Sequence, residues 1–166
     1  MSQLMILIGS ASDLKLTEDG IAALKSAKVR FRLHIASAHR SPNRVHDLVS
    51  EFVKQGGKVL ICVAGMSAHL AGVVAAMTVK PVIAVPVSRP ATAGLDSLLS
   101  MSQMPAGVPV ATMGLDKAGF TNACIFAEQI LALSDARLEE TLAAERHDMQ
   151  AKVEASDRDN SIRFEG

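Results

Sequence analysis

The sequence contains no tryptophan, no tyrosine and only five phenylalanines among its 166 residues. Flavin sites usually stack aromatic side chains against the ring, so a flavin-binding electron carrier is a weak interpretation. Basic and acidic residues balance at 17 each, which argues against a nucleic-acid-binding surface. No apolar run is long enough to cross a bilayer, and no basic leader precedes the first apolar run. We therefore expect a cytoplasmic protein that binds neither nucleic acids nor membranes.

Cysteine is also scarce. Cys62 and Cys124 both lie in apolar stretches, which predicts buried thiols in a reducing compartment rather than a disulfide. No cluster of cysteine and histidine has the spacing of a metal site, so no metal is expected. With 49% apolar and 20% charged residues, the composition suits a globular subunit that buries surface in an oligomer.

Five short apolar runs predict the buried strands of a parallel sheet. They span residues 4–8, 31–36, 59–64, 81–87 and 108–113. Helical patterns follow each run or link it to the next. These predicted helices span residues 12–28, 42–55, 68–78, 93–102 and 117–133. Ser41 and Pro42 suit the N-cap and the first position of the second helix.

The alternation of strands and helices predicts a single α/β domain over residues 1–166. The expected architecture has three layers around a doubly wound, parallel, five-stranded sheet, as in flavodoxin-like proteins. One further helix, at 135–154, follows this unit and precedes a polar tail at 156–166. Because little of the sheet remains for this extra C-terminal helix to cover, we expect it to dock on a neighbouring subunit.

Ligands of open parallel sheets bind beyond the carboxyl ends of the strands, so the residues that follow each strand are candidate site residues. Gly9, Ser10, Ser12 and Asp13 follow the first strand. Their backbone N–H groups and hydroxyls suit an anion, but capping of the next helix by Ser12 or Asp13 is an equally ordinary use. Asp13 would repel a phosphate, so ribose hydroxyls are its better partners.

The loop after the second strand contains Ser37, Ala38, His39 and Arg40. Histidine titrates near neutrality, so His39 can donate a proton and then reclaim it. Arginine binds phosphate or carboxylate through two parallel N–H groups. A lone loop histidine is more often a surface residue than a catalyst, but this tandem at a strand end favours a functional site.

Small residues dominate the loop after the third strand. Gly65, Ser67 and Ala68 leave little side-chain bulk, so a ligand can approach the backbone before Leu70. His69 either lines this site or is a structural histidine, and both interpretations stay open. Residues 88–90 follow the fourth strand, and all four loops converge on one edge of the predicted sheet.

Five motifs in consistent order resemble the N5-carboxyaminoimidazole ribonucleotide mutases, small bacterial enzymes of purine biosynthesis. They are Gly-Ser-Ala-Ser-Asp at 9–13, Ser-Ala-His-Arg-Ser-Pro at 37–42, Ala-His-Leu at 68–70, Gly-Leu-Asp-Ser-Leu at 94–98 and Gln-Met-Pro-Ala-Gly-Val-Pro-Val at 103–110. The similarity runs from about residue 4 to residue 133, and several motifs in order are far more specific than any one of them.

The resemblance implies an isomerase that moves a carboxyl group from the exocyclic nitrogen of an imidazole ribonucleotide to its ring carbon, without a metal or organic cofactor. By position, His39 would be the general acid and base. The family assembles as an octamer with sites at subunit borders. The substrate-binding residues implied or predicted are Ser10, Ser12 and Arg40 for the phosphate, Asp13 for the ribose, and Ser37, Ala38, Gly65, Ser67, Ala68, His69 and Leu70 around the carboxylate and ring.

The loop after the third strand departs from the mutase pattern. Met66 stands where the mutases usually have glycine, Ser67 where they have alanine, and Ala71 where they have proline. The related aminoimidazole ribonucleotide carboxylases, which use carbon dioxide directly, have Arg-Ser at the first two positions, so Ser67 resembles them. Arg40 favours the mutase because the carboxylases have lysine there. A mutase is the preferred interpretation, the carboxylase is the alternative, and Met66 predicts an altered substrate preference.

A flavodoxin-like signalling receiver is the remote alternative from another class. A receiver needs an acidic pair after the first strand and an aspartate at the end of the third. After the first strand this chain has only Asp13, and at the end of the third strand it has Ala64 followed by Gly65. No residue is therefore available as the phosphate acceptor.

Overall fold

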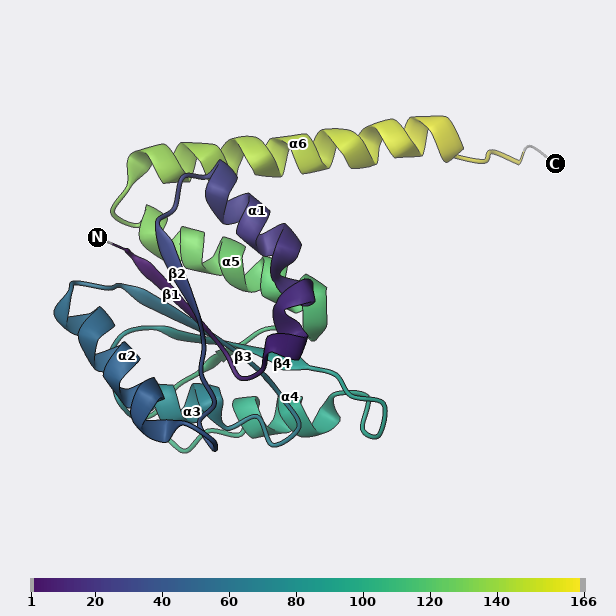
Figure 1. Ribbon diagram of the computed structural model, residues 1–166. Coiled ribbons are helices and arrows are strands. Elements are labelled where there is room, and N and C mark those ends of the chain that lie inside the picture. The colour runs from purple at the N-terminus through teal and green to yellow at the C-terminus, as the bar shows by residue number, and fades with distance from the viewer. Residues whose placement is uncertain (1, 165–166) are drawn as a thin grey trace.

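The computed structural model describes residues 2–164, and Figure 1 shows its elements in chain order. Five strands form one sheet in the order β2-β1-β3-β4-β5, and every pair is parallel. The strands are β1 (Leu4–Ile8), β2 (Phe31–Ile35), β3 (Val59–Gly65), β4 (Val82–Val87) and β5 (Ala111–Thr112). This strand order is that of flavodoxin-like folds, so the predicted fold class is confirmed.

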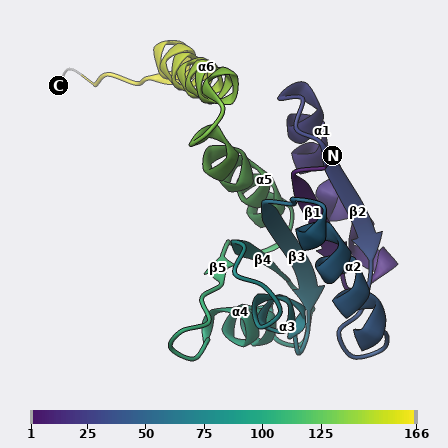
Figure 2. The ribbon, with the colours of Figure 1, turned by 90° about the vertical axis from the view of Figure 1, so that its left-hand side faces the viewer.

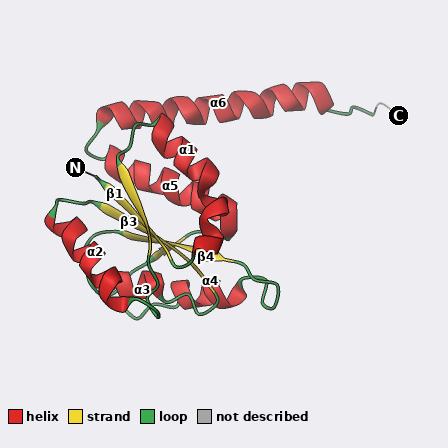
Figure 3. Cartoon of the chain, viewed as in Figure 1, coloured by secondary structure: helices red, strands yellow, loops and turns green. Residues whose placement is uncertain are grey.

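Helices cover both faces of the sheet (Figure 3). They are a 3₁₀ helix, η1 (Ala11–Thr17), followed by α1 (Glu18–Ser26), α2 (Pro42–Lys54), α3 (Leu70–Ala75), α4 (Leu95–Ser102), α5 (Asp116–Ala132) and α6 (Ala136–Asn160). One core lies between the sheet and the pair α1 and α5, and a second lies between the sheet and the helices α2, α3 and α4. In Figure 2, α6 lies outside α5, away from the sheet.

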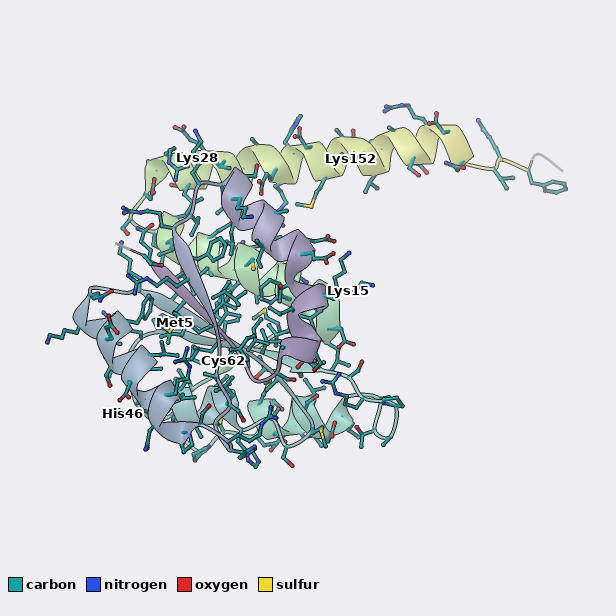
Figure 4. The ribbon with its side chains drawn as sticks, viewed as in Figure 1. Met5, Lys15, Lys28, His46, Cys62 and Lys152 are labelled. Atoms are coloured by element: carbon teal, nitrogen blue, oxygen red, sulfur yellow. The ribbon has the colours of Figure 1, made fainter. Side chains whose placement is uncertain are left out.

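Strand β1 shows how the sequence builds both cores. Its five residues are all buried, because a central strand of a parallel sheet has helices on both faces. Leu4, Ile6 and Ile8 point to the α1/α5 core, whereas Met5 and Leu7 point to the α2/α3/α4 core. Figure 4 labels Met5 inside the body and, in contrast, the exposed Lys152 on α6.

Both cysteines are free and buried, as the sequence predicted. Cys62 lies in the α2/α3/α4 core and Cys124 in the α1/α5 core. Burial raises the pKa of both thiols well above the ordinary range, and Glu128 adds to the effect at Cys124. The thiolate, which is the reactive form, is therefore scarce at both positions.

The predicted helix at 12–28 is wrong in its first half. Residues Ala11–Thr17 form the 3₁₀ helix η1, and only Glu18–Ser26 is α-helical. The N-cap of η1 is Ser10, whose hydroxyl accepts from the Ser12 backbone N–H. The predicted caps, Ser12 and Asp13, lie inside η1. The hydroxyl of Thr17 bonds to the Leu14 carbonyl, a local contact that competes with the regular helical pattern.

The predicted strand at 108–113 shortens to the two residues of β5. Pro109 lacks the N–H that hydrogen bonding to a neighbouring strand needs, and the Val108 N–H bonds locally to the Pro105 carbonyl.

Three predicted helices also differ in length. The helix predicted at 68–78 covers only Leu70–Ala75, and the one predicted at 93–102 begins at Leu95. The last helix runs to Asn160, so part of the predicted polar tail is helical.

Helix α6 begins where the sequence indicated, because the Asp135 side chain accepts from the Leu138 N–H. Its first turns pack on α5 through Leu138 and Leu142, and the remainder extends beyond the body of the molecule (Figure 1). Along residues 2–164, we find no helix with both the length and the apolar character that crossing a membrane requires.

Candidate active site

Four loops at the carboxyl ends of β1, β2, β3 and β4 enclose a cleft of about 580 Å³. This volume is in the range of small-molecule sites. The cleft is lined by Gly9, Ser10, Ser12, Asp13, Ser37, Ala38, His39, Arg40, Ala64, Gly65, Met66, Ser67, His69, Leu70 and Arg89. The strand order places β1 between β2 and β3, which brings together loops that lie far apart in the sequence.

Two histidines meet at this cleft. His39 Nε2 lies 2.9 Å from His69 Nδ1, and the rings are nearly perpendicular, with centroids 5.0 Å apart. His39 follows β2 and His69 precedes α3, so the contact spans 30 positions of the chain. A hydrogen bond between two ring nitrogens needs a hydrogen on one and a lone pair on the other, so the pair can hold and pass on a proton.

The loop that carries His39 is closed by its own serines. The Ser41 hydroxyl accepts from the Ser37 N–H at 3.1 Å and bonds back to the Ser37 carbonyl at 3.2 Å. The Ser37 hydroxyl in turn accepts from the Arg40 N–H at 3.2 Å. Ser41 therefore occupies the N-cap position of α2, as predicted, but its side chain fastens the loop instead of capping the helix. Pro42 is the first helical residue, also as predicted.

Arg40 ties this loop to β1. Its Nη2 donates to the Gly9 carbonyl at 3.2 Å, and the residue is exposed at the cleft. The guanidinium thus lies close to Ser10, beside the start of the 3₁₀ helix. Hydroxyls, N–H groups at a helix start and a guanidinium are together suited to an anion.

Beyond Ser10, the loop after β1 places a carboxylate in the cleft. The Ser12 hydroxyl lies 2.9 Å from both the Ser10 hydroxyl and Asp13 Oδ1. A carboxylate only accepts, so the Ser12 hydroxyl donates to Asp13 and accepts from Ser10. Asp13 is only 3% exposed, although it lines the cleft. A carboxylate in such a place needs a cationic partner.

That partner is Arg89, which the sequence analysis placed at this edge of the sheet but did not include among the site residues. Arg89 Nη2 lies 2.6 Å from Asp13 Oδ1, and the two residues are 76 positions apart in the chain. Arg89 comes two residues after the end of β4. The rule that selected the other residues, a polar side chain directly after a buried strand, would have selected Arg89 as well.

The loop after β3 is unusual in its backbone. Met66 has φ of 60°, the left-handed region that favours glycine, and its side chain is 64% exposed beside the cleft. The preceding Gly65 is confined, since a Cβ there would come within 3.0 Å of the Val87 carbonyl oxygen. Ser67 and Leu70 also line the cleft. This loop therefore presents its backbone and several side chains to the cleft, with the exposed Met66 among them.

Ala68 differs from the other predicted site residues. It is buried in the core formed with α2, α3 and α4, and it does not line the cleft. The small side chain lets α3 begin close to the sheet. In the chain from residue 2 to residue 164, no three His, Cys, Asp or Glu side chains gather in a way that could hold a metal ion.

The fold and cleft define a class: a flavodoxin-like α/β protein with a small-molecule site that combines a histidine pair, two arginines and a buried carboxylate. Comparison with known proteins identifies the family. The profile of the AIR carboxylase family matches residues 3–152, so the chain belongs to this family.

Its relatives include N5-carboxyaminoimidazole ribonucleotide mutases. That of Methanocaldococcus jannaschii is 50% identical over 153 residues, which cover 92% of this chain and 93% of that protein. That of Bacillus subtilis is 42% identical over 153 residues, which cover 92% and 94%. Among solved structures, PurE of Treponema denticola superposes with a TM-score of 0.87 at 26% identity, over 96% of this chain and 98% of that one.

Proposed function

We propose that this protein is an isomerase of de novo purine biosynthesis. It converts N5-carboxyaminoimidazole ribonucleotide into 4-carboxy-5-aminoimidazole ribonucleotide by moving the carboxyl group from nitrogen to a ring carbon. The observation that carries the proposal is the His39–His69 pair beside Arg40, in a chain 50% identical to a mutase. A ribonucleotide is accordingly its small-molecule substrate.

The cleft has a group for each part of this substrate. Ser10, Ser12 and Arg40 would bind the phosphate, since they combine hydroxyls with a guanidinium next to a helix start. Asp13 would accept hydrogen bonds from the ribose hydroxyls, because a carboxylate accepts and a diol donates. Ser37 and Ala38 line the same cleft and would contact the ring. The carboxyl group would lie against the backbone at Gly65 and Ser67, between His69 and Leu70.

His39 would move the proton. It donates a proton to the carbamate nitrogen as the bond from nitrogen to the carboxyl carbon breaks and carbon dioxide is released. The electron pair of the ring carbon then attacks the carbon dioxide, and His39 removes the hydrogen from that carbon. The imidazole returns to its starting state, so the cycle consumes no proton and needs no cofactor. His69, 2.9 Å away, would hold the His39 ring in place between the two transfers.

The alternative donor is free carbon dioxide, as in the carboxylases of the same family. Relatives named as mutases at 39–50% identity favour the carbamate. An assay with each donor tests the choice: the carbamate nucleotide, or aminoimidazole ribonucleotide with bicarbonate. We expect turnover of the carbamate at low bicarbonate. Turnover only at high bicarbonate would instead assign the chain to the carboxylases.

We further propose that the protein is a cytoplasmic homo-oligomer, with the octamer implied by the resemblance. Free buried thiols are typical of a reducing compartment. An apolar groove of about 1050 Å³ lies outside the cleft, among α3, α5 and the strands β4 and β5. Met77 and Val79 border it and are exposed, although such apolar surface is usually covered in the assembled protein. A second copy of the chain is the occupant we propose.

A further inference from the structure

An ion pair between Arg89 and Asp13 lies inside the cleft. Arg89 Nη2 and Asp13 Oδ1 are 2.6 Å apart, which is short even for a charge-assisted hydrogen bond. The Asp13 side chain is 3% exposed and that of Arg89 is 38% exposed. The carboxylate is therefore largely desolvated, while the guanidinium keeps one side open to the cleft.

The hydrogen bonds of the Asp13 side chain all involve one oxygen, Oδ1. Oδ1 accepts from Arg89 Nη2 and from the Ser12 hydroxyl, at 2.6 and 2.9 Å. Oδ2 has no hydrogen-bond partner in the described part of the chain, and Asp13 lines the cleft. A carboxylate held by two donors at one oxygen has a defined orientation and offers the other oxygen to a ligand.

Arg89 also lies against the end of β3. Its Nε lies 3.6 Å from the position that a Cβ on Gly65 would take. From its place after β4, the side chain thus passes the end of β3, which lies between β4 and β1, and reaches Asp13 in the loop after β1. Asp13 and Gly65 both line the cleft, so the arginine connects two parts of one site.

We propose that Arg89 is a positioning residue that holds the Asp13 carboxylate in place and oriented for the ribose diol of the substrate. This inference rests on the proposed function, because it takes the ligand to be a ribonucleotide. Without Arg89, the buried carboxylate loses its only cationic contact within residues 2–164, and its free oxygen is no longer aimed at the diol. Arg89 consequently acts on substrate selection through Asp13.

A double-mutant cycle tests the coupling. The variants are Arg89→Ala, Asp13→Asn and the double variant, with Arg89→Lys to retain a cation. Arg146→Ala is the matched control, because Arg146 is an exposed arginine on α6 outside the cleft. Turnover of the carbamate nucleotide gives KM and kcat. Titration with ribose 5-phosphate and with 2-deoxyribose 5-phosphate measures diol recognition independently of activity.

We expect each single variant to raise KM by about 10- to 100-fold, with a smaller effect on kcat, since charge-assisted hydrogen bonds are lost in substrate binding. Both should lose the preference for ribose 5-phosphate over its deoxy analogue, and the double variant should be no worse than Asp13→Asn alone. Arg89→Lys should regain part of the preference, and Arg146→Ala should behave as the wild type.

Two results would overturn the inference. One is additive losses in the double variant, which would mean that Arg89 acts independently of Asp13. The other is an Arg89→Ala protein that binds both sugar phosphates more weakly but keeps its preference between them, which indicates a purely structural role. Failure of the proposed function would give a different result. The wild type would then not turn over the carbamate nucleotide, although it would still bind ribose 5-phosphate more tightly than the deoxy analogue.

Discussion

At the scale of single residues, the proposed chemistry depends on two imidazoles that come from different loops. His39 and His69 are exposed at the cleft and share a hydrogen bond of 2.9 Å. The backbone around each ring is fixed by its surroundings: the serines at 37 and 41 close the loop of His39, and the backbone N–H of His69 donates to the Ser67 carbonyl at 2.8 Å. Such preorganised positioning is what a group that must deliver and retrieve one proton requires.

Replacing His39 by asparagine should separate chemistry from binding. The amide keeps the polarity and approximate size of the imidazole but cannot carry a proton, so we expect kcat to fall by about 10²–10⁴-fold or more. Nucleotide binding, measured by calorimetry, should persist, because Ser10, Ser12 and Arg40 are unchanged. His46→Asn, on the exposed face of α2, is the control. Normal turnover in the His39 variant would remove this residue from the mechanism.

Met66 allows a test of backbone strain. At φ of 60°, a residue with a Cβ is strained, whereas glycine is not. Met66→Gly and Met66→Ala both remove the exposed side chain, and they differ only in the Cβ. We expect the glycine variant to have the higher free energy of unfolding, by about 1 kcal/mol. At most positions alanine is instead the more stabilising of the two residues. Denaturant titrations of the two variants measure the difference, and an alanine variant of equal or greater stability would show that no strain is present.

At the scale of helices, the packing of α6 on α5 encloses an unusual carboxyl group. Glu128 of α5 is 0% exposed, and neither of its side-chain oxygens has a hydrogen-bond partner in the described chain. Burial raises the pKa of Glu128 to about 7, and the charge of Glu145 on α6 adds to the shift. Cys124 lies one turn earlier on α5 and is itself buried.

This carboxyl group makes stability depend on pH. Since the pKa of Glu128 is raised on folding, the folded chain keeps a proton that the unfolded chain releases, and stability falls as the pH rises from about 4.5 to about 7. Above this window the full cost applies, on the order of 3 kcal/mol. Glu128→Gln should therefore unfold at a higher temperature than the wild type near pH 8, but at a similar temperature near pH 5.

Thermal unfolding at one fixed protein concentration measures this difference. Glu139→Gln, an exposed position of the first turns of α6, serves as the control and should leave the pH dependence unchanged. If Glu128→Gln changes the unfolding temperature by the same amount near pH 5 and near pH 8, the raised pKa of Glu128 is not the cause of the pH dependence.

The elements also show what the sequence could predict. Four strands and the cleft residues that follow them were predicted from apolar runs and polar strand ends, because these depend on local patterns. The 3₁₀ start at Ala11–Thr17 and the short β5 depend on particular hydrogen bonds of Thr17 and Val108 that composition does not reveal. The strand-end rule could have selected Arg89 as a site residue, but its contact with Asp13, 76 positions away, is visible only in the structure.

At the scale of the whole molecule, the chain has apolar surface that its own fold leaves uncovered. Val79 is fully exposed at 100%, and it borders the groove together with Met77 and Phe126. The groove shares no lining residue with the candidate active-site cleft, so a subunit bound there would leave this cleft open. Helix α6 extends away from the body and exposes Met149 and Val153 along its length. Both surfaces fit an assembly in which copies of the chain cover one another.

Val79→Asp tests this assembly at the groove. A charge at a covered apolar position is left unpaired and desolvated, so we expect association to weaken by at least about 100-fold. Sedimentation velocity should show smaller species than the wild type at the same concentration. Leu133→Asp, at an exposed apolar position outside the groove, is the matched control. If Val79→Asp sediments like the wild type, or if both variants dissociate equally, the groove is not the contact between subunits. Should Val79→Asp dissociate and also lose turnover with His39 and Arg40 intact, the active site itself depends on a neighbouring copy.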